Sequence, residues 1–271
     1  METRPDTSDL LVARGPRARP NYRRVVAIPY AGAGPNTVAI WAEAMDEGTE
    51  ALFVRLPGRE TRFSEPPLVD AREAARQVAD AIGSLAPLPT VLLGHSMGSL
   101  VAYLTAVQLA QVGLGHLAGL IVSGLNPPHA DTLCPRVGRM ADSEFIAVLD
   151  RLGGLPAGFS DNRELIDLLL PLLRADFSLV ETYRHVDTNP LPVQIVAISG
   201  ERDCLAPRDA AIGWGRYTDV GFHSVVHDGD HFAIMHPQGM WQNAVSTALA
   251  RIWESRERPE AFRRATASSN T

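Results

Sequence analysis

The feature that most constrains the fold is a Gly-x-Ser-x-Gly pentapeptide at residues 94–98, which reads Gly-His-Ser-Met-Gly. An apolar run, Val-Leu-Leu at 91–93, precedes it, and apolar residues at helical spacing follow from Leu100 to Leu109. This order of strand, sharp turn and helix is the context in which the pattern marks a nucleophile elbow. We therefore predict that Ser96 stands at the apex of a strand-to-helix turn. The alternative is a purely structural turn.

The two glycines of the pentapeptide explain how such a turn can form. Without side chains at Gly94 and Gly98, the strand and the helix can approach each other closely. Ser96 then projects its hydroxyl beyond the sheet. The N-terminus of the following helix presents backbone N–H groups and the positive end of its dipole to an anion formed nearby. The stretch favours a nucleophilic Ser at the carboxyl end of a strand.

Apolar runs alternate with helical patterns along most of the chain. This alternation predicts an α/β fold with a mostly parallel central sheet and helices on both faces. Ligands of such sheets bind beyond the carboxyl ends of the strands. The expected strands are at 24–29, 52–56, 90–93, 120–122, 193–198 and 223–226. Helices are expected through Trp41 to Met45, at 70–85, directly after Ser96 and at 240–253.

Composition and patterning also predict the domain organisation. Residues 21–257 are expected to form a single domain, between a flexible arm at 1–20 and a flexible tail at 258–271, both polar and without periodicity. No strand pattern appears between about 129 and 187. We interpret this stretch as a helical lid inserted over one end of the sheet.

The lid sequence contains signals for two helices. Asp142 or Ser143 could cap the first, and Asp161 or Asn162 could cap a longer second one. Pro171 lies inside the second pattern and should kink or restart that helix, because proline cannot donate the backbone hydrogen bond.

Composition excludes several classes of function. The formal net charge of −6 argues against nucleic acid as the main partner. All 25 basic residues are Arg, which removes Lys-dependent Schiff-base chemistry and the Lys-containing phosphate loop.

Cys134 and Cys204 make neither a disulfide framework nor a metal-ligand set, so no metal is expected and a cytoplasmic, reducing compartment is the default. No apolar run is long enough to span a membrane, and the run after Arg23 and Arg24 is too short for an export signal.

A Ser hydroxyl is a weak nucleophile at neutral pH, so it needs a base in contact with it and an acid that orients the base. Behind such an elbow, the expected chain order is Ser, acid, His. Asp203 and His231 each follow an expected strand, at 193–198 and 223–226, by a few residues. We assign Ser96 as nucleophile, His231 as general base and then acid, and Asp203 as the residue that orients His231.

Other residues compete for two of these roles. His227, at the end of its strand, is the main rival of His231, and Glu201 and Asp230 compete with Asp203. Asp230 is adjacent to His231 in sequence, so we expect its side chain to point elsewhere. Position along the chain favours Asp203 and His231 without excluding the others.

The oxyanion formed by attack on a carbonyl needs at least two hydrogen-bond donors. The backbone N–H of Met97, directly after the nucleophile, is expected to be one. The second is expected at Ala31, in the loop after the first strand. This glycine-rich loop could also suggest a dinucleotide site, but a third Gly is missing at the required spacing and Pro35 has no N–H to donate. No cofactor is expected.

Short motifs beyond the pentapeptide occur in an order that is far more specific than the elbow alone. They are Ile-Pro-Tyr-Ala-Gly-Ala at 28–33, Leu-Pro-Gly-Arg-Glu at 56–60, Arg-Leu-Gly-Gly at 151–154, Leu-Pro-Leu-Leu-Arg-Ala-Asp-Phe at 170–177, Glu-Thr-Tyr at 181–183 and Gly-Asp-His-Phe at 229–232. Together with the pentapeptide, these motifs resemble the stand-alone type II thioesterases of polyketide and nonribosomal peptide assembly lines. The likeness extends over about residues 25–248.

The resemblance implies an α/β-hydrolase fold with a helical lid, and hydrolysis of acyl groups from the phosphopantetheine arms of acyl or peptidyl carrier proteins. It also implies a triad of Ser96, Asp203 and His231. Two departures from the family pattern are present. The first loop reads Tyr-Ala-Gly-Ala-Gly-Pro where His-Ala-Gly-Gly is more usual, and Asp230 stands where a second Gly is usual. Neither departure touches the triad.

The lid is rich in leucine, and most of its leucines must be helix contacts. We predict that a minority face inward and line an acyl tunnel. The four candidates are Leu165, Leu168, Leu169 and Leu172. We expect a monomer whose partners are the carrier domains of a synthase, with no membrane or nucleic acid partner.

Rival functions share parts of this pattern. A general carboxylesterase or an acyl-CoA thioesterase of the same fold would use the same triad. An acyl-carrier acyltransferase also uses Gly-His-Ser-x-Gly, but it needs an Arg downstream of the nucleophile to hold a carboxylate, and no Arg lies between Met97 and Pro135. A non-catalytic docking protein with a hydrolase-like fold is the remaining alternative.

Overall fold

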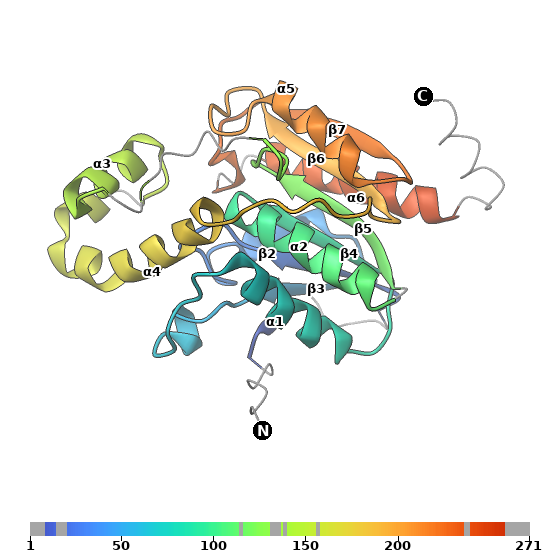
Figure 1. Ribbon diagram of the computed structural model, residues 1–271, viewed down its shortest axis with the longest axis horizontal. Helices are drawn as coiled ribbons and strands as arrows, with labels where there is room; N and C mark the ends of the chain where they lie inside the picture. Colours follow the sequence, from blue (N-terminus) through green and yellow to red (C-terminus); the bar gives the residue numbers. More distant parts are fainter. Residues whose placement is uncertain are drawn as a thin grey trace.

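The computed structural model describes residues 9–14, 21–113, 116–130, 137, 140–155, 158–235 and 239–257. Its centre is a seven-stranded sheet with the strand order β1-β3-β2-β4-β5-β6-β7 (Figure 1). Neighbouring strands are parallel except for β1 and β3, which confirms the predicted mostly parallel α/β sheet. The strands are β1 (Leu11–Arg14), β2 (Arg23–Ile28), β3 (Thr49–Val54), β4 (Thr90–His95), β5 (Leu117–Ser123), β6 (Gln194–Gly200) and β7 (Phe222–His227).

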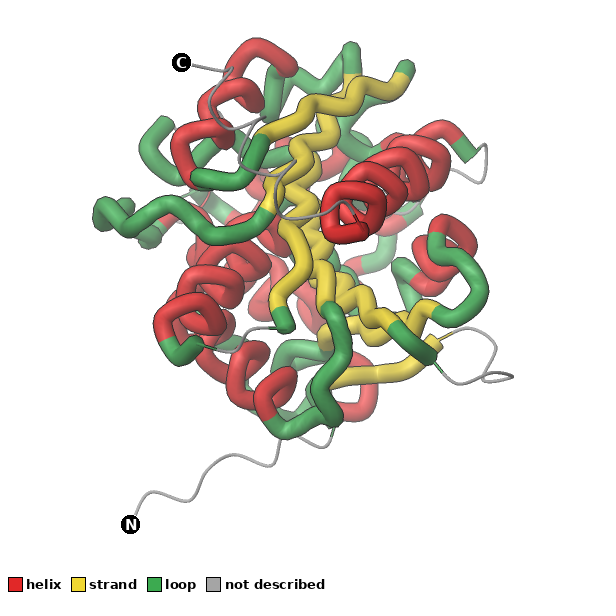
Figure 2. The backbone as a smooth tube through the Cα atoms, turned by 90° about the vertical axis from the view of Figure 1, so that its right-hand side faces the viewer, coloured by secondary structure: helices red, strands yellow, loops and turns green. Residues whose placement is uncertain are grey.

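Helices cover both faces of the sheet (Figure 2). On one face, α1 (Ala71–Gly83) packs against α2 (Met97–Gln111), which lies on β4 and β5. On the other face, α6 (Met240–Glu257) packs on β5, β6 and β7. The helix expected through Trp41 is present there as the 3₁₀ helix η1 (Ala39–Ala44). The remaining short helices of this body are η2 (Glu60–Arg62), α5 (Arg208–Ala211), η5 (Ile212–Tyr217) and η6 (Ala233–Met235).

Helix α2, which carries the elbow, is apolar on almost every side, and its side chains are buried from Met97 to Val107. The reason is its position, because the sheet, α1 and the lid helix α4 (Arg163–Glu181) all contact it. A helix that is apolar all round belongs in a core. This burial holds the N-terminus of α2, and therefore Ser96, rigidly at the end of the sheet.

The N-terminal arm predicted at 1–20 is wrong for part of its length. Leu11–Arg14 forms β1, antiparallel to β3, with Leu11 opposite Val54, and Leu10 is buried. Its short apolar stretch covers the edge of β3, whose backbone N–H and C=O groups would otherwise lack partners on that side. Residues 1–8 and 15–20 of the predicted arm, and the predicted tail at 258–271, lie outside the described residues.

Between β5 and β6 the chain forms the lid, and no described residue from 129 to 187 belongs to a strand. The lid consists of α3 (Asp142–Arg151), the short η4 (Phe159–Asp161) and α4, and the two long helices stand to one side of the sheet (Figure 1). They share a small core of their own. Its buried members include Phe145, Leu149, Phe159, Leu170 and Leu173.

Helix α4 begins as the sequence predicted, because the Asn162 side chain accepts the N–H of Leu165 at 3.0 Å. Of the two outcomes expected at Pro171, a kink or a restart of the helix, the restart does not occur, since α4 continues through Pro171. Packing of the flanking turns against the lid core and α2 outweighs the one backbone hydrogen bond that proline removes. In the described part of the chain, no helix has the length and apolar character needed to cross a membrane.

Candidate active site

Ser96 occupies a strained turn between β4 and α2. Its backbone φ of 51° and ψ of −123° are unusual for a residue other than Gly. The flanking glycines are required by contact, because a Cβ on Gly94 would lie 2.2 Å from the carbonyl oxygen of Gly98, and one on Gly98 would lie 2.1 Å from that of Ile28. Both separations are far below van der Waals contact. The geometry is that of the predicted elbow, with Ser96 partly exposed at its apex.

The structure brings Ser96, His231 and Asp203 together. The Nε2 atom of His231 lies 3.0 Å from the Oγ atom of Ser96, and its Nδ1 atom lies 2.9 Å from Oδ2 of Asp203. Asp203 follows β6 and His231 follows β7, so both reach the same end of the sheet as Ser96. A carboxylate can only accept, so Nδ1 carries the imidazole proton and Nε2 is free to accept the proton of the Ser hydroxyl.

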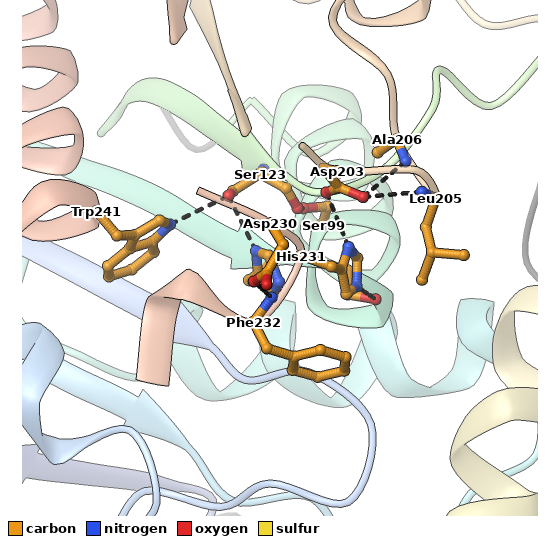
Figure 3. Close-up of polar contacts among 11 residues, drawn as sticks. Ser99, Ser123, Asp203, Leu205, Ala206, Asp230, His231, Phe232 and Trp241 are labelled. Carbon is orange, nitrogen blue, oxygen red and sulfur yellow. Dashed lines mark hydrogen bonds and ion pairs between the residues drawn. The ribbon is translucent and has the colours of Figure 1, made fainter. Parts of the chain in front are cut away.

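Asp203 is held in place from two sides, as Figure 3 shows. Its Oδ1 atom accepts the backbone N–H groups of Leu205 at 2.9 Å and Ala206 at 3.0 Å, while Oδ2 faces His231. Burial by itself raises the pKa of this carboxyl, but the hydrogen bond and charge of His231 and the N–H of Ala206 outweigh it and hold the pKa below its ordinary value. Asp203 is therefore a fixed anion behind the imidazole.

The rival residues have other surroundings. His227 is buried at the end of β7, and its Nδ1 atom has no hydrogen-bond partner among the described residues. Burial lowers the pKa of His227. The carboxylate of Asp230 accepts the N–H of Phe232 at 3.0 Å and so closes the local turn, as its proximity to His231 suggested. Glu201 is exposed. None of the three replaces a member of the Ser96, His231 and Asp203 arrangement.

The predicted oxyanion donors lie on the same pocket as Ser96. Ala31, Met97 and His231 all line it. The neighbouring N–H of Gly32 is directed elsewhere, because it donates to Oδ2 of Asp176 at 2.7 Å. This leaves the N–H of Ala31 as the candidate from the first loop, beside the candidate N–H of Met97 at the N-terminus of α2.

The comparisons with known proteins identify the family. A family model described as a thioesterase domain matches residues 23–252. The chain belongs to the thioesterase domain family. It is accordingly an enzyme of the α/β-hydrolase fold that acts on thioesters, and the fold class predicted from sequence is confirmed.

Relatives of this thioesterase include proteins named for gramicidin S and yersiniabactin biosynthesis. The gramicidin S biosynthesis protein GrsT of Aneurinibacillus migulanus is 32% identical over 209 residues, covering 77% of this chain and 82% of that protein. Thioesterase PikA5 of Streptomyces venezuelae is 32% identical over 246 residues, covering 88% and 84%. The solved structure of YbtT, a type II thioesterase of the yersiniabactin NRPS/PKS pathway, superposes with a TM-score of 0.80 at 30% identity, covering 89% of this chain and 97% of that one.

The pocket at Ser96 of this thioesterase is small, with a cavity volume of about 40 Å³. Besides the residues already named, its described lining comprises Gly124, Leu125, Asn126, Phe177, Val180 and Leu205. Two of these, Phe177 and Val180, come from α4. The lid therefore forms one wall of the pocket.

The four leucines predicted to line an acyl tunnel are not among the described residues that line this pocket, so their role in a tunnel stays a prediction. Leu165 and Leu169 pack against the lid's own core, and Leu168 is 52% exposed. Leu172 is buried against the turn at Gly58 instead. The α4 residues that do line the pocket with Ser96 are Phe177 and Val180, which lie more than one turn beyond Leu172 in the helix.

A second histidine supports the site, and sequence reasoning missed its role. His95 is buried beside His231 with ring centroids 4.9 Å apart. Its Nδ1 atom lies 2.9 Å from Oγ of Ser123. The same oxygen accepts the indole N–H of Trp241 at 3.2 Å (Figure 3). Burial, and then the proximity of His231, push the pKa of His95 well below its ordinary value, so it stays neutral. Its place inside the pentapeptide was the available signal.

No group of three or more His, Cys, Asp or Glu side chains in the described residues could hold a metal ion. Cys204 is exposed and not in a disulfide, and Cys134 lies outside the described residues. The reactive groups that the structure brings together are the hydroxyl of Ser96, the imidazole of His231 and the carboxylate of Asp203.

Proposed function

We propose that this thioesterase hydrolyses acyl groups from the phosphopantetheine arms of carrier proteins, and so removes stalled or aberrant acyl units during polyketide or nonribosomal peptide synthesis. The observation that carries the proposal is the contact of His231 with both Ser96 and Asp203, at 3.0 and 2.9 Å, in a chain of the thioesterase family. The names of two relatives support the choice of carrier-bound substrates, because GrsT is named for gramicidin S biosynthesis and YbtT is named as a type II thioesterase of an NRPS/PKS pathway. The proposed reaction needs no metal or cofactor.

In the first half of the proposed reaction, His231 takes the hydroxyl proton of Ser96 as Oγ attacks the thioester carbonyl carbon. The carbonyl electron pair moves to oxygen, and the N–H groups of Met97 and Ala31 stabilise that oxyanion. Asp203 stabilises the imidazolium of His231. The tetrahedral intermediate then collapses, the C–S bond breaks, and the proton on Nε2 passes to the departing pantetheine sulfur.

The second half repeats these steps with water. His231 removes a proton from water as the water oxygen attacks the acyl carbon on Ser96. Collapse of the second tetrahedral intermediate breaks the C–O bond, returns the proton to Oγ and releases a carboxylic acid. The free carrier thiol and the acid are then the two products of one turnover.

A substrate panel tests the proposal. The purified protein is assayed with one short acyl group presented as acyl-carrier protein, acyl-pantetheine, acyl-CoA and the matched oxygen ester, with Ser96→Ala as control. We expect kcat/KM to be highest for the acyl-carrier thioester. An oxygen ester hydrolysed as well as the thioesters would instead support a general carboxylesterase, and equal rates for acyl-CoA and acyl-carrier would support an acyl-CoA thioesterase. A Ser96→Ala protein with full activity would exclude the proposed mechanism.

A further inference from the structure

A buried ion pair joins the lid helix to the turn that follows β3. Asp176 in α4 is fully buried, and Arg59 is 4% exposed. The two side chains make a bidentate contact, with Nη2 of Arg59 donating to Oδ1 of Asp176 at 2.7 Å and Nη1 donating to Oδ2 at 3.0 Å. The residues are 117 positions apart. Both belong to sequence motifs, at 56–60 and 170–177, that the proposed reaction does not use.

The same ion pair also holds the loop that carries Ala31. Oδ2 of Asp176 accepts the backbone N–H of Gly32 at 2.7 Å, and Nη1 of Arg59 donates to the carbonyl oxygen of Ala33 at 2.8 Å. The backbone on both sides of Gly32 is therefore fixed by two charged groups. Because a peptide unit is planar, holding the N–H of Gly32 also fixes the plane that it shares with the carbonyl of Ala31.

Local packing gives this loop little freedom to adopt another shape. Gly32 has a φ of +79°, and a Cβ there would lie 2.6 Å from Cδ2 of Leu173, the α4 residue one turn before Asp176. On the far side, the carboxylate of Glu60 accepts the N–H of Asn36 at 2.7 Å. The loop is thus seated between α4 and the turn at Arg59 and Glu60.

The stability of the folded protein does not by itself explain why this ion pair is buried here. Desolvation of two buried charges offsets most of their attraction, so well-packed apolar residues often serve stability equally well. Apolar side chains could not accept the N–H of Gly32 or donate to Ala33. The contacts of this pair are directed at the backbone next to the oxyanion donor, which is where small displacements affect rate most strongly.

We propose that Asp176 is a positioning residue that, together with Arg59, holds the N–H of Ala31 where the oxyanion forms. Catalysis then depends on α4 packing against the loop that carries Ala31. This inference rests on the proposed function, in which Ser96 attacks a thioester carbonyl and Ala31 stabilises the oxyanion. When α4 lifts away, Gly32 loses its acceptor and the donor of Ala31 loses its support. Hydrolysis then occurs only with the lid helix in place.

The test compares Asp176→Ala, Asp176→Asn and Arg59→Gln in the full chain. Asp142→Asn is the matched control for the acid, since Asp142 pairs with Arg174 within the lid at 2.6 Å. Arg62→Gln is the control for the base, because Arg62 is buried in the same turn but pairs with Glu65 at 2.6 Å. Thermal midpoints are measured for every variant. KM and kcat are measured with an acyl-pantetheine thioester.

We expect Asp176→Ala to lower kcat by about 10- to 100-fold and to change KM by less than about threefold. The reason is that misplacing one oxyanion donor lowers the catalytic rate by up to about 100-fold. Asp176→Asn, whose amide oxygen can still accept from Gly32, should retain more activity than Asp176→Ala. Arg59→Gln should resemble Asp176→Asn. The two control variants should keep the wild-type kcat.

A second readout reports on the oxyanion directly. A short alkyl trifluoromethyl ketone adds to Ser96 reversibly and forms a tetrahedral oxyanion, so its affinity should fall by the same factor as kcat in each variant. A merely structural pair would lower the thermal midpoint and leave kcat and ketone affinity unchanged. Finding this result in Asp176→Ala would overturn the inference. If Asp176→Ala does not fold, the same result in Asp176→Asn and Arg59→Gln would overturn it.

Labelling of Ser96 by a fluorophosphonate separates this inference from the proposed function, because it needs the oxyanion donors but no thioester. If the wild-type protein is labelled but hydrolyses no thioester, the proposed function fails, and slower labelling of Asp176→Ala still supports the positioning role. If the wild-type protein hydrolyses thioesters and the Asp176 and Arg59 variants are labelled at the wild-type rate, the positioning role alone fails.

Discussion

Nε2 of His231 lies 3.0 Å from Oγ of Ser96, although 135 residues separate them in the chain. Their strands are not neighbours, because β5 and β6 lie between β4 and β7 in the sheet. The turn after β7 therefore reaches back across two strand ends. Close packing of Gly200 and Gly229 permits this, since a Cβ on Gly200 would lie 2.4 Å from the carbonyl oxygen of Gly229.

The triad assignment predicts a graded set of losses. Ser96→Ala should lower kcat by about a millionfold, as in other serine hydrolases, His231→Ala by nearly as much and Asp203→Ala by less. The order follows from the roles, because nucleophile and base act in one step while the carboxylate only orients and stabilises the base. Steady-state and single-turnover rates on one acyl thioester measure all three.

His227→Ala is the control for this series. His227 is buried near the site but makes no hydrogen bond to Ser96 among the described residues, so its loss should leave kcat within about threefold of wild type. If His227→Ala were the crippling change and His231→Ala were tolerated, the base would be misassigned.

The elbow predicts that Gly98 cannot be replaced. In Gly98→Ala the new Cβ would lie 2.1 Å from the carbonyl oxygen of Ile28, so strand and helix must separate and Ser96 must move. We expect loss of about 100-fold or more in kcat, together with a lower thermal midpoint. Gly221→Ala is the control, because nothing lies within 4 Å of a Cβ there and its stability should change by about 0.5 kcal/mol or less. A Gly98→Ala protein with wild-type kcat would contradict the close packing.

The pocket wall predicts which lid residues set acyl preference. Val180 lines the pocket at Ser96, so Val180→Trp should lower kcat/KM for longer acyl chains by about tenfold or more relative to an acetyl thioester. Phe177→Ala should shift the preference in the opposite direction. Leu168→Trp is the control, because Leu168 is 52% exposed and away from the pocket. If Leu168→Trp changed the acyl-chain preference and Val180→Trp did not, the result would support the prediction that leucines of the lid line the acyl tunnel.

The buried His95 predicts how stability depends on pH. An unfolded His gains a proton as pH falls through about 6.5, but the pKa of His95 in the fold lies well below that value because of burial and the neighbouring His231. Below about pH 6.5 the unfolded state therefore binds more protons than the folded state. The free energy of unfolding then decreases as the pH is lowered, by at most about 1.4 kcal/mol per pH unit from this group. Urea unfolding at pH 7.5, 6.0 and 5.0 measures the slope.

His95→Gln removes this titration, so its decline in stability between pH 7.5 and pH 5.0 should be shallower than that of the wild type. The variant should also be less stable at pH 7.5, because the contact of His95 with Ser123 is weakened. Equal slopes in the two proteins would mean that His95 does not contribute to the acid sensitivity.

Much of the fold could be predicted because its signals are local. The apolar run at 90–93 lies inside β4, and the run at 193–198 overlaps β6 from Gln194 onward. Asp70 caps α1 by accepting the N–H of Arg72 at 2.7 Å. The strand β1 was missed because its four residues are stable only against the edge of β3. Such a short segment has no periodicity of its own that distinguishes it from an arm.

The sequence by itself determined the elbow at Ser96 and the order in which an acid and a His follow it, because both depend on short motifs and on where strands end. Only the tertiary structure decided that His231 rather than His227 faces the hydroxyl, and that Phe177 and Val180 form the lid wall. It alone also joined Asp176 to Gly32. These relationships arise between elements far apart in the chain, where packing directions, and no local pattern, set which side chains meet.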